Sequence, residues 1–212
     1  MPKRPPGVPR GDQRWSTFLS NHATAIIACD FFLAVTATFR SLYVFVVIHH
    51  ATRQLLHVNV TAHPTAAWTL QQLRETVGLS STYRYLIHDR DSIFAQDLDE
   101  SLERLGVKIV KSPPHSPMAN AVCERVIGTI RRECLDWLIP LSESHLRTIL
   151  QRWIDHYNRK RPHSRLGPGV PDPPAIRSAT TPKSRHQLDA NATVLVQSVL
   201  GGLHHEYSLA SQ

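Results

Sequence analysis

The sequence has few cysteines and lacks the short motifs of several common enzyme classes. Its three cysteines, Cys29, Cys123 and Cys134, form no CxxC pair and no zinc-type spacing, and their number is odd. No GxxxxGK, GxGxxG or GxSxG pattern occurs, which excludes the usual NTPase, dinucleotide-binding and hydrolase motifs. Reduced thiols of this kind are typical of a cytoplasmic protein.

Long hydrophobic segments are also missing. The longest uninterrupted apolar run covers residues 42–48, far too short to cross a bilayer. The N-terminal sequence MPKRPPGVPR has basic residues but lacks the apolar segment of a secretory signal. We therefore expect a cytoplasmic protein with no membrane partner.

Positive charge is in excess and unevenly distributed. The 212 residues carry a net charge of +7, and 42% are hydrophobic, enough for one domain with a substantial core. Residues 21–120 hold eight Lys and Arg against eight Asp and Glu, whereas residues 121–185 hold twelve against six. A neutral domain followed by an arginine-rich stretch favours a polyanionic partner such as nucleic acid.

Composition divides the chain into three parts. Residues 1–20 are rich in Pro, Gly and charge and are expected to form a tail or linker. Residues 21–160 are expected to form the core domain. Residues 161–212 are expected to form a basic, proline-rich extension that ends in a β-hairpin turning at Gly201 and Gly202.

Hydrophobic periodicity predicts an α/β fold. Three consecutive strand-like runs come first and favour an antiparallel meander; a helical pattern, a fourth strand, a short helix and a fifth strand follow, and two helices close the domain. We therefore expect a mixed five-stranded sheet flanked by helices. The expected strands cover residues 24–35, 41–52, 53–62, 83–89 and 107–111, and the expected helices begin near residues 66, 97, 118 and 142.

The helix that begins near residue 118 predicts a buried stripe. At 100° per residue, five apolar side chains fall within one arc of about 80°. Glu124 lies at the rim of this arc, and Asn120 and Arg131 lie on the same ridge. The five apolar residues are Cys123, Ile127, Ile130, Cys134 and Trp137.

Three carboxylates from distant parts of the chain are candidates for one site. Asp30 interrupts an apolar run, where a carboxylate needs a cation, a hydrogen-bond partner or water. If the first and fourth strands are neighbours, Asp30 and Asp89 meet on one side and the helix brings Glu124 over them. Carboxylates about 4 Å apart repel by roughly 4 kcal/mol at a dielectric near 20, so a cation is required. Two Mg²⁺ ions would suit phosphodiester chemistry, which points to cutting or joining of nucleic acid.

Three segments carry a family resemblance: HDRDSIF, SPPHSPMANAVCERVIGTIRREC and HYNRKRPHSRLG. Together, across residues 15–174, they resemble the catalytic core of retroviral-type integrases and of the DDE transposases of bacterial insertion sequences. The resemblance implies a ribonuclease H-like fold and a D…D–about 35–E arrangement, and Asp89 and Glu124 are 35 positions apart. It further implies that Asp30, Asp89 and Glu124 bind two Mg²⁺ (or Mn²⁺) ions, and that Asn120 and Arg131 touch DNA near the scissile phosphate.

The implied activity is cleavage at transposon ends and attack of a 3′-OH on target DNA, by a homo-oligomer associated with the bacterial nucleoid. Residues 1–20 are too few for the family's end-recognition module, so a separate helix-turn-helix protein is a possible partner. Two alternatives stay open. The chain could be a nuclease of the same fold that cuts without joining, or a truncated, non-catalytic DNA-binding or assembly fragment.

Some assignments depart from the family pattern or have two interpretations. Asp91 competes with Asp89 as the second ligand, and Asp89 is preferred because it directly ends the apolar strand. His88 and His115 flank the site but are interpreted as strand-end or loop residues, since two-metal chemistry needs no histidine base. Four basic residues after the last helix are interpreted as DNA-backbone contacts rather than a solvated run; they are Arg159, Lys160, Arg161 and Arg165.

Overall fold

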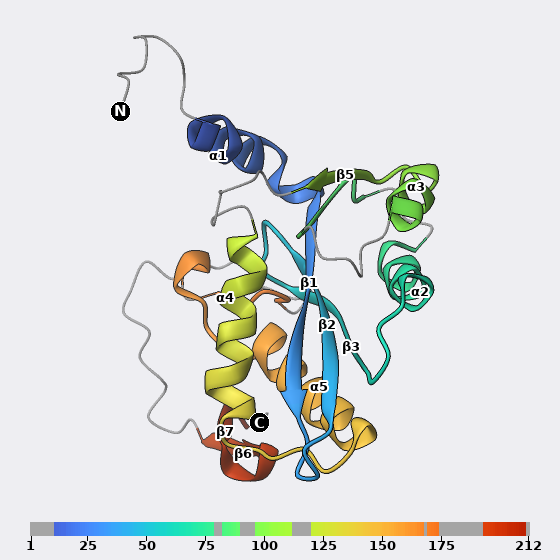
Figure 1. Ribbon diagram of the computed structural model, residues 1–212. Helices are drawn as coiled ribbons and strands as arrows, with labels where there is room; N and C mark the ends of the chain where they lie inside the picture. Colours follow the sequence, from blue (N-terminus) through green and yellow to red (C-terminus); the bar gives the residue numbers. More distant parts are fainter. Residues whose placement is uncertain are drawn as a thin grey trace, which may run out of the picture.

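A five-stranded mixed sheet forms the centre of the domain (Figure 1). The computed structural model describes residues 11–78, 82–89, 96–111, 120–167, 169–173 and 193–210. The strand order is β3-β2-β1-β4-β5. The strands are β1 (Ile26–Val35), β2 (Ser41–His49), β3 (Leu55–Thr61), β4 (Tyr85–His88) and β5 (Lys108–Lys111).

The strand pairing confirms the expected mixed sheet. β1, β2 and β3 form an antiparallel meander, and β4 and β5 run parallel to β1. Parallel neighbours need a crossover connection, which the helical segments between these strands supply. The long, apolar β1 and β2 are the central strands because their residues are buried on both faces.

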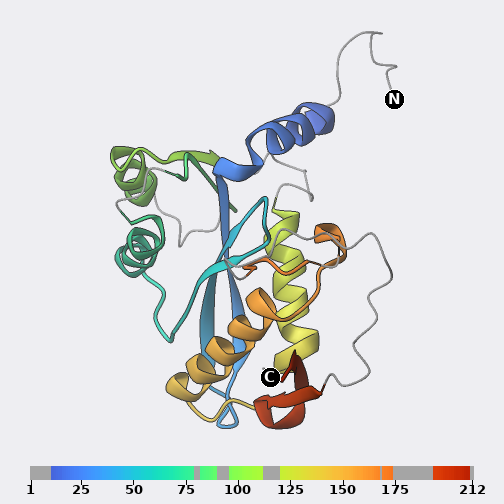
Figure 2. The same ribbon diagram turned by 180° about the vertical axis from the view of Figure 1, so that it is seen from behind.

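Helices cover both faces of this sheet (Figures 1 and 2). α2 and α3 lie on one face, and α4 and α5 lie on the other. No helix within the described parts of the chain is both long and apolar enough to cross a membrane. The helical elements are α1 (Gly11–His22), η1 (Ala23–Ala25), α2 (Ala66–Val77), α3 (Gln96–Arg104), α4 (Ala121–Ile130), η2 (Arg131–Leu135), α5 (Glu143–Arg159), η3 (Ser164–Leu166) and η4 (Leu200–Gly202).

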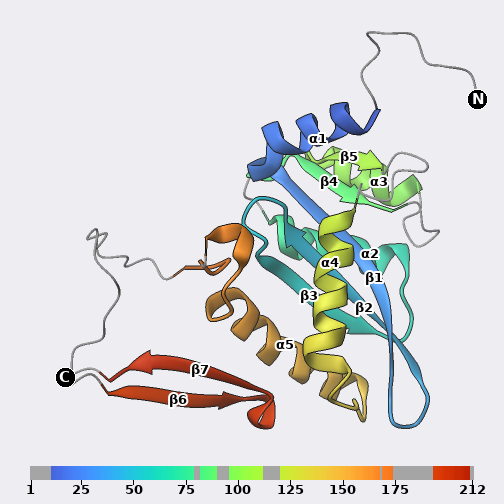
Figure 3. The same ribbon diagram turned by 90° about the vertical axis from the view of Figure 1, so that its left-hand side faces the viewer.

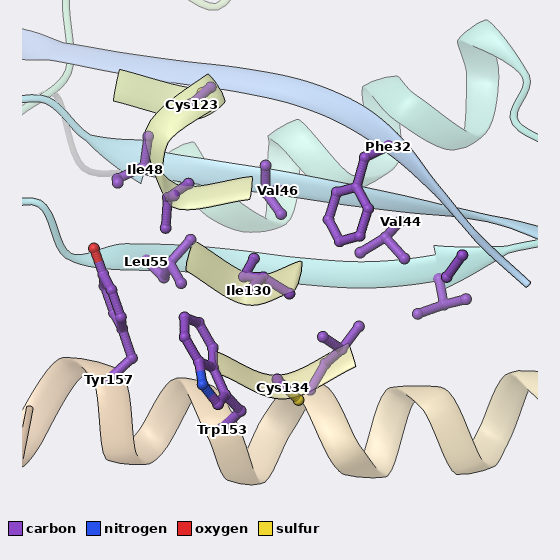
Figure 4. Close-up of a cluster of buried hydrophobic side chains, with 14 of the residues drawn as sticks. Phe32, Val44, Val46, Ile48, Leu55, Cys123, Ile130, Cys134, Trp153 and Tyr157 are labelled. Atoms are coloured by element: carbon purple, nitrogen blue, oxygen red, sulfur yellow. The ribbon is translucent and has the colours of Figure 1, made fainter. Parts of the chain in front are cut away.

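Two apolar cores result from the alternation of side chains along β1. Ala28 and Phe32 face α4 and α5, whereas Ile27 and Cys29 face α2 and α3. Figure 4 shows the first core, in which the fully buried Trp153 of α5 packs among strand and α4 side chains. These cores fix the position of α4 over β1, which matters for the candidate site.

The N-terminal helix differs from the expected tail. Residues 11–20 belong to α1, and Phe18 packs edge-on against Tyr85 of β4 with ring centroids 5.2 Å apart. Trp15, Phe18 and Leu19 recur at helical spacing and are partly buried against the core. The expectation was wrong for these residues because the composition of residues 1–20 as a whole is dominated by the Pro- and Gly-rich residues at its start, which conceals the short helical pattern that follows. The boundaries of the three expected parts otherwise stay a prediction.

α4 does not continue as a regular helix. It passes into the π-helical turn η2, whose wider turn rotates the residues that follow relative to the expected stripe. Cys123, Ile130 and Cys134 are buried as expected, but Trp137 is 69% exposed. The stripe was therefore predicted correctly as far as Cys134 within the π turn, although Ile127 is only partly buried.

The C-terminal hairpin lies where it was expected. β6 (Val194–Val199) pairs antiparallel with β7 (His204–Leu209), and Gly201 and Gly202 lie in the turn. The hairpin lies beside α5 (Figure 3), where Glu206 contacts His156 at 3.1 Å. This docking supplies the support that an isolated two-stranded hairpin lacks.

Candidate active site

Strand register brings Asp30 and Asp89 to neighbouring positions on the adjacent strands β1 and β4. Ala28 of β1 pairs with Ile87 of β4, and each aspartate lies two residues further along its chain. Ala28 and Ile87 both face α4, so alternation directs Asp30 to that face as well. Asp89 follows β4 directly and is exposed. The expected proximity of the first and fourth strands is thus confirmed.

The N-terminus of α4 lies over Asp30. The buried Asn120, which precedes the helix, donates from Nδ2 to the carbonyl oxygen of Cys29 at 3.2 Å and to Oδ2 of Asp30 at 3.5 Å. Oδ1 of Asp30 accepts from the backbone N–H of Phe31 at 2.8 Å. Asn120 therefore joins the middle of β1 to the start of α4, which fixes the helix relative to the aspartate.

Glu124 lies one turn into α4. Its backbone N–H donates to the carbonyl of Asn120 at 3.1 Å, and its side chain is exposed. Burial raises the pKa of the neighbouring Cys123 thiol, and the nearby Cys29, Asp30 and Glu124 raise it further. A carboxylate in the first turn is also favoured by the helix dipole.

The described residues show only part of the expected three-acid site. Within them, no three His, Cys, Asp or Glu side chains lie close enough together to hold a metal ion. Asp91, the competing ligand, and residues 112–119, which include His115, lie outside the described residues. The donors near Asp30 nevertheless suit Mg²⁺ or Mn²⁺, since they are carboxylate and amide oxygens. The buried Oδ1 of Asn120 has no hydrogen-bond partner among the described residues, so it is available as an acceptor.

A buried polar network behind Asp89 was not foreseen from the sequence. His88 is 1% exposed; its Nδ1 lies 2.6 Å from the carbonyl oxygen of Asp89, and its Nε2 lies 3.0 Å from Oδ1 of Asp99 on α3. Oδ2 of Asp99 accepts from Nζ of Lys111 on β5 at 2.7 Å. His88 is thus a buried strand-end histidine, as expected. In the sequence, only the position of Asp99 next to the apolar Leu98, which is buried, indicated that this aspartate could be buried as well.

Arg131, in η2, contacts β1 at a point beyond Asp30. Its guanidinium donates to the carbonyl oxygen of Leu33 at 3.1 Å and lies 5.2 Å from the ring centroid of Phe32. Leu33 is three residues beyond Asp30, about 10 Å along the strand at 3.3 Å per residue. The side chain is exposed and remains a candidate for contact with DNA.

The four basic residues at and after the end of α5 differ in their surroundings. Arg161 makes two hydrogen bonds to Glu133, at 2.6 and 2.7 Å, and Arg159 lies 3.4 Å from Asp155 and 3.5 Å from Asp172. These pairs leave Arg161 much less available than the sequence suggested. The side chains of Lys160 and Arg165 are exposed.

Comparison with known proteins bears on the family and the fold. Residues 105–171 match the family model of the integrase core domain. An uncharacterised 39.2 kDa protein of insertion element IS476 from Xanthomonas euvesicatoria is 25% identical over 168 residues, which cover 78% of this chain. This chain spans only 46% of that relative's length.

Solved structures of integrase and transposase cores share the ribonuclease H-like fold of this chain. The catalytic domain of Mos1 mariner transposase matches with a TM-score of 0.56 and 14% identity, over 72% of this chain and 85% of that one. The HTLV-2 integrase catalytic core domain in complex with magnesium matches with a TM-score of 0.50 and 14% identity, over 64% and 85%. Both likenesses concern the fold, which was expected from the sequence.

Proposed function

We propose that this chain is the catalytic core of a DNA transposase or integrase that cleaves DNA strands and joins them by metal-dependent chemistry. The observation that carries the proposal is the link made by Asn120. It holds Asp30 at the start of the helix that presents Glu124, and this helix lies in the segment that matches the integrase core domain. Asp89 lies at the equivalent position on the neighbouring strand, 35 residues before Glu124.

Asp30, Asp89 and Glu124 are proposed to hold two Mg²⁺ or Mn²⁺ ions. Two bound ions would supply activation of the attacking oxygen and stabilisation of the leaving oxygen in phosphodiester displacement. The protein's own contribution is positional: Asn120 orients Asp30, and the His88 contact supports the backbone at Asp89. Related cores support this choice of metal, since the HTLV-2 core is described with magnesium and the Mos1 domain with Mn.

The substrate is proposed to be DNA, both transposon ends and target. Positive charge after residue 120 supports phosphate contact, with Asn120, Arg131, Arg159, Lys160 and Arg165 as candidates. Arg161 is a weaker candidate because Glu133 already engages it. We further propose a homo-oligomer in the bacterial cytoplasm, associated with the nucleoid. The dimeric and trimeric forms of the HTLV-2 core support an oligomer, and a separate helix-turn-helix protein is proposed as a further partner.

The test is a strand-cleavage and strand-transfer assay with the purified chain, Mg²⁺ or Mn²⁺, a labelled end with a 3′-OH and a target plasmid. Glu124→Gln should abolish cleavage and joining while leaving the circular dichroism spectrum and the melting temperature unchanged, because the side chain is exposed. Glu103→Gln, an exposed glutamate of α3 on the other face, is the matched control and should retain activity.

The same assay separates the alternatives. Cleavage without a joined product would identify a nuclease of this fold. DNA binding without either reaction, unaffected by Glu124→Gln, would identify a non-catalytic DNA-binding or assembly fragment. That alternative is favoured by one observation, the absence of a three-ligand cluster among the described residues.

A further inference from the structure

A cavity of about 190 Å³ lies between α4, the turn after β2 and the segment that follows α5. It is far larger than the roughly 15 Å³ that a single water needs. Figure 1 shows the orange segment around η3 beside the N-terminal half of α4. Five of its polar lining residues are basic, the others carry hydroxyl groups, and none of the lining residues is acidic; the basic ones are Arg53, Arg125, Arg161, Arg165 and His163.

Most of the positive charge in this cavity is unneutralised. Arg161 is paired with Glu133. By contrast, the guanidinium groups of Arg53, Arg125 and Arg165 make no ion pair and no hydrogen bond with any residue that the structure describes. Burial lowers the pKa of Arg53, and the neighbouring charges of Arg165 and Arg125 lower it further. Three like charges around one hollow create a strong attraction for an anion.

Arg53 is held at the cavity by an unfavourable backbone conformation. It has a φ of 64°, in the left-handed region that glycine adopts without cost and that arginine rarely adopts. The turn is fixed by hydrogen bonds from the N–H of Arg53 to the carbonyl of His49 at 3.0 Å and from the N–H of His49 to that of Gln54 at 2.9 Å. Strain that persists at a charged side chain facing a cavity is typical of functional sites.

His163 supplies a fourth polar group at the same place. Its Nε2 is buried and has no partner among the described residues. A ring nitrogen in this position can donate one hydrogen bond to an oxygen of a bound anion. Arginine forks and a ring N–H that converge from three segments suit an anion with several acceptor oxygens, such as phosphate.

We propose that this cavity binds one phosphate group, and that in the working protein this is a backbone phosphate of DNA. The choice of DNA as its source rests on the proposed function. Arg125 directly follows Glu124 on α4, so their side chains leave the helix about 100° apart. A phosphate held by Arg125, Arg53 and Arg165 therefore fixes the position of a DNA strand relative to Glu124 without occupying the carboxylates.

The experiment uses the full chain with two probes: inorganic phosphate, followed by calorimetry, and an arbitrary DNA duplex, followed by fluorescence anisotropy over a salt series. The variants are Arg53→Gly and Arg125→Gln. Arg74→Gln, which removes an exposed arginine of α2 on the opposite face of the sheet, is the matched control. Arg53→Gly relieves the backbone strain, so its melting temperature should stay the same or rise, which separates loss of binding from loss of folding.

Each pocket variant should weaken phosphate binding about tenfold and reduce the slope of DNA affinity against salt by about one, with Arg74→Gln unchanged in phosphate binding. Weaker phosphate binding with an unchanged DNA slope supports the site and identifies free phosphate as its ligand. Absence of saturable phosphate binding, or equal binding by wild type and both pocket variants, overturns it. Glu124→Gln should keep phosphate affinity, so failure of the catalytic proposal is distinguishable from failure of this one.

Discussion

Replacement of Asp99 by alanine tests the buried network behind Asp89. Asp99 has a side chain only 10% exposed and accepts from both His88 and Lys111. Asp99→Ala removes the contact between this carboxylate and Nε2 of the His88 ring, which is 1% exposed. Losing the partner of a buried polar group costs about 1–3 kcal/mol. Because Lys111 is half-exposed, its share is only about 0–1 kcal/mol, and we expect a total of about 2 kcal/mol.

Urea unfolding followed by circular dichroism measures this loss directly. Asp99→Asn keeps an acceptor oxygen for His88 and should cost less, about 1 kcal/mol. The exposed Glu103 on the same helix is the control, and Glu103→Ala should change the free energy of unfolding by no more than about 0.5 kcal/mol. A loss below about 0.5 kcal/mol for Asp99→Ala would refute the view that this network contributes to stability.

Three further outcomes are expected. Trp153→Ala should destabilise the fold by about 3–5 kcal/mol because the side chain is fully buried, whereas Trp137→Ala should cost no more than about 0.5 kcal/mol; urea unfolding compares the two. Burial lowers the pKa of His50 from 6.5 to about 4, so the unfolded state binds more protons in this range, and stability should fall as the pH drops from 6.5 toward 4. His50→Gln should flatten that part of the curve; an unchanged curve would contradict the assignment. All three cysteines are buried with raised pKa values, so a thiol reagent at neutral pH should label none in the folded chain and three after denaturation.

Much of the fold could be predicted because local patterns agree with the tertiary structure. The meander could be predicted from the apolar runs of β1, β2 and β3. The helix α2 could be predicted from the helical spacing of apolar residues after Pro64. Thr65 caps α2, Gly78 ends it, and Ser142 caps α5, and these residue types indicate helix boundaries in the sequence itself. α1 was missed because its short apolar pattern followed a proline-rich segment.

The candidate site could be predicted only in outline. The neighbouring strands of Asp30 and Asp89 follow from topology, and the position of Glu124 follows from helical spacing. The contacts among His88, Asp99 and Lys111 join three elements and depend on packing that no local pattern records. The same holds for the basic cavity, where Arg53 and Arg125 are 72 positions apart in the sequence.

Mn²⁺ binding by single acid variants tests the central claim most directly. The free-ion concentration is followed by electron paramagnetic resonance during titration of the chain bound to a transposon-end duplex. If Asp30, Asp89 and Glu124 hold the metal, Asp30→Asn, Asp89→Asn and Glu124→Gln should each weaken Mn²⁺ binding by an order of magnitude or more, and Asp91→Asn should not. Binding by all three variants that equals wild type, or loss confined to Asp91→Asn, would contradict this assignment of the site.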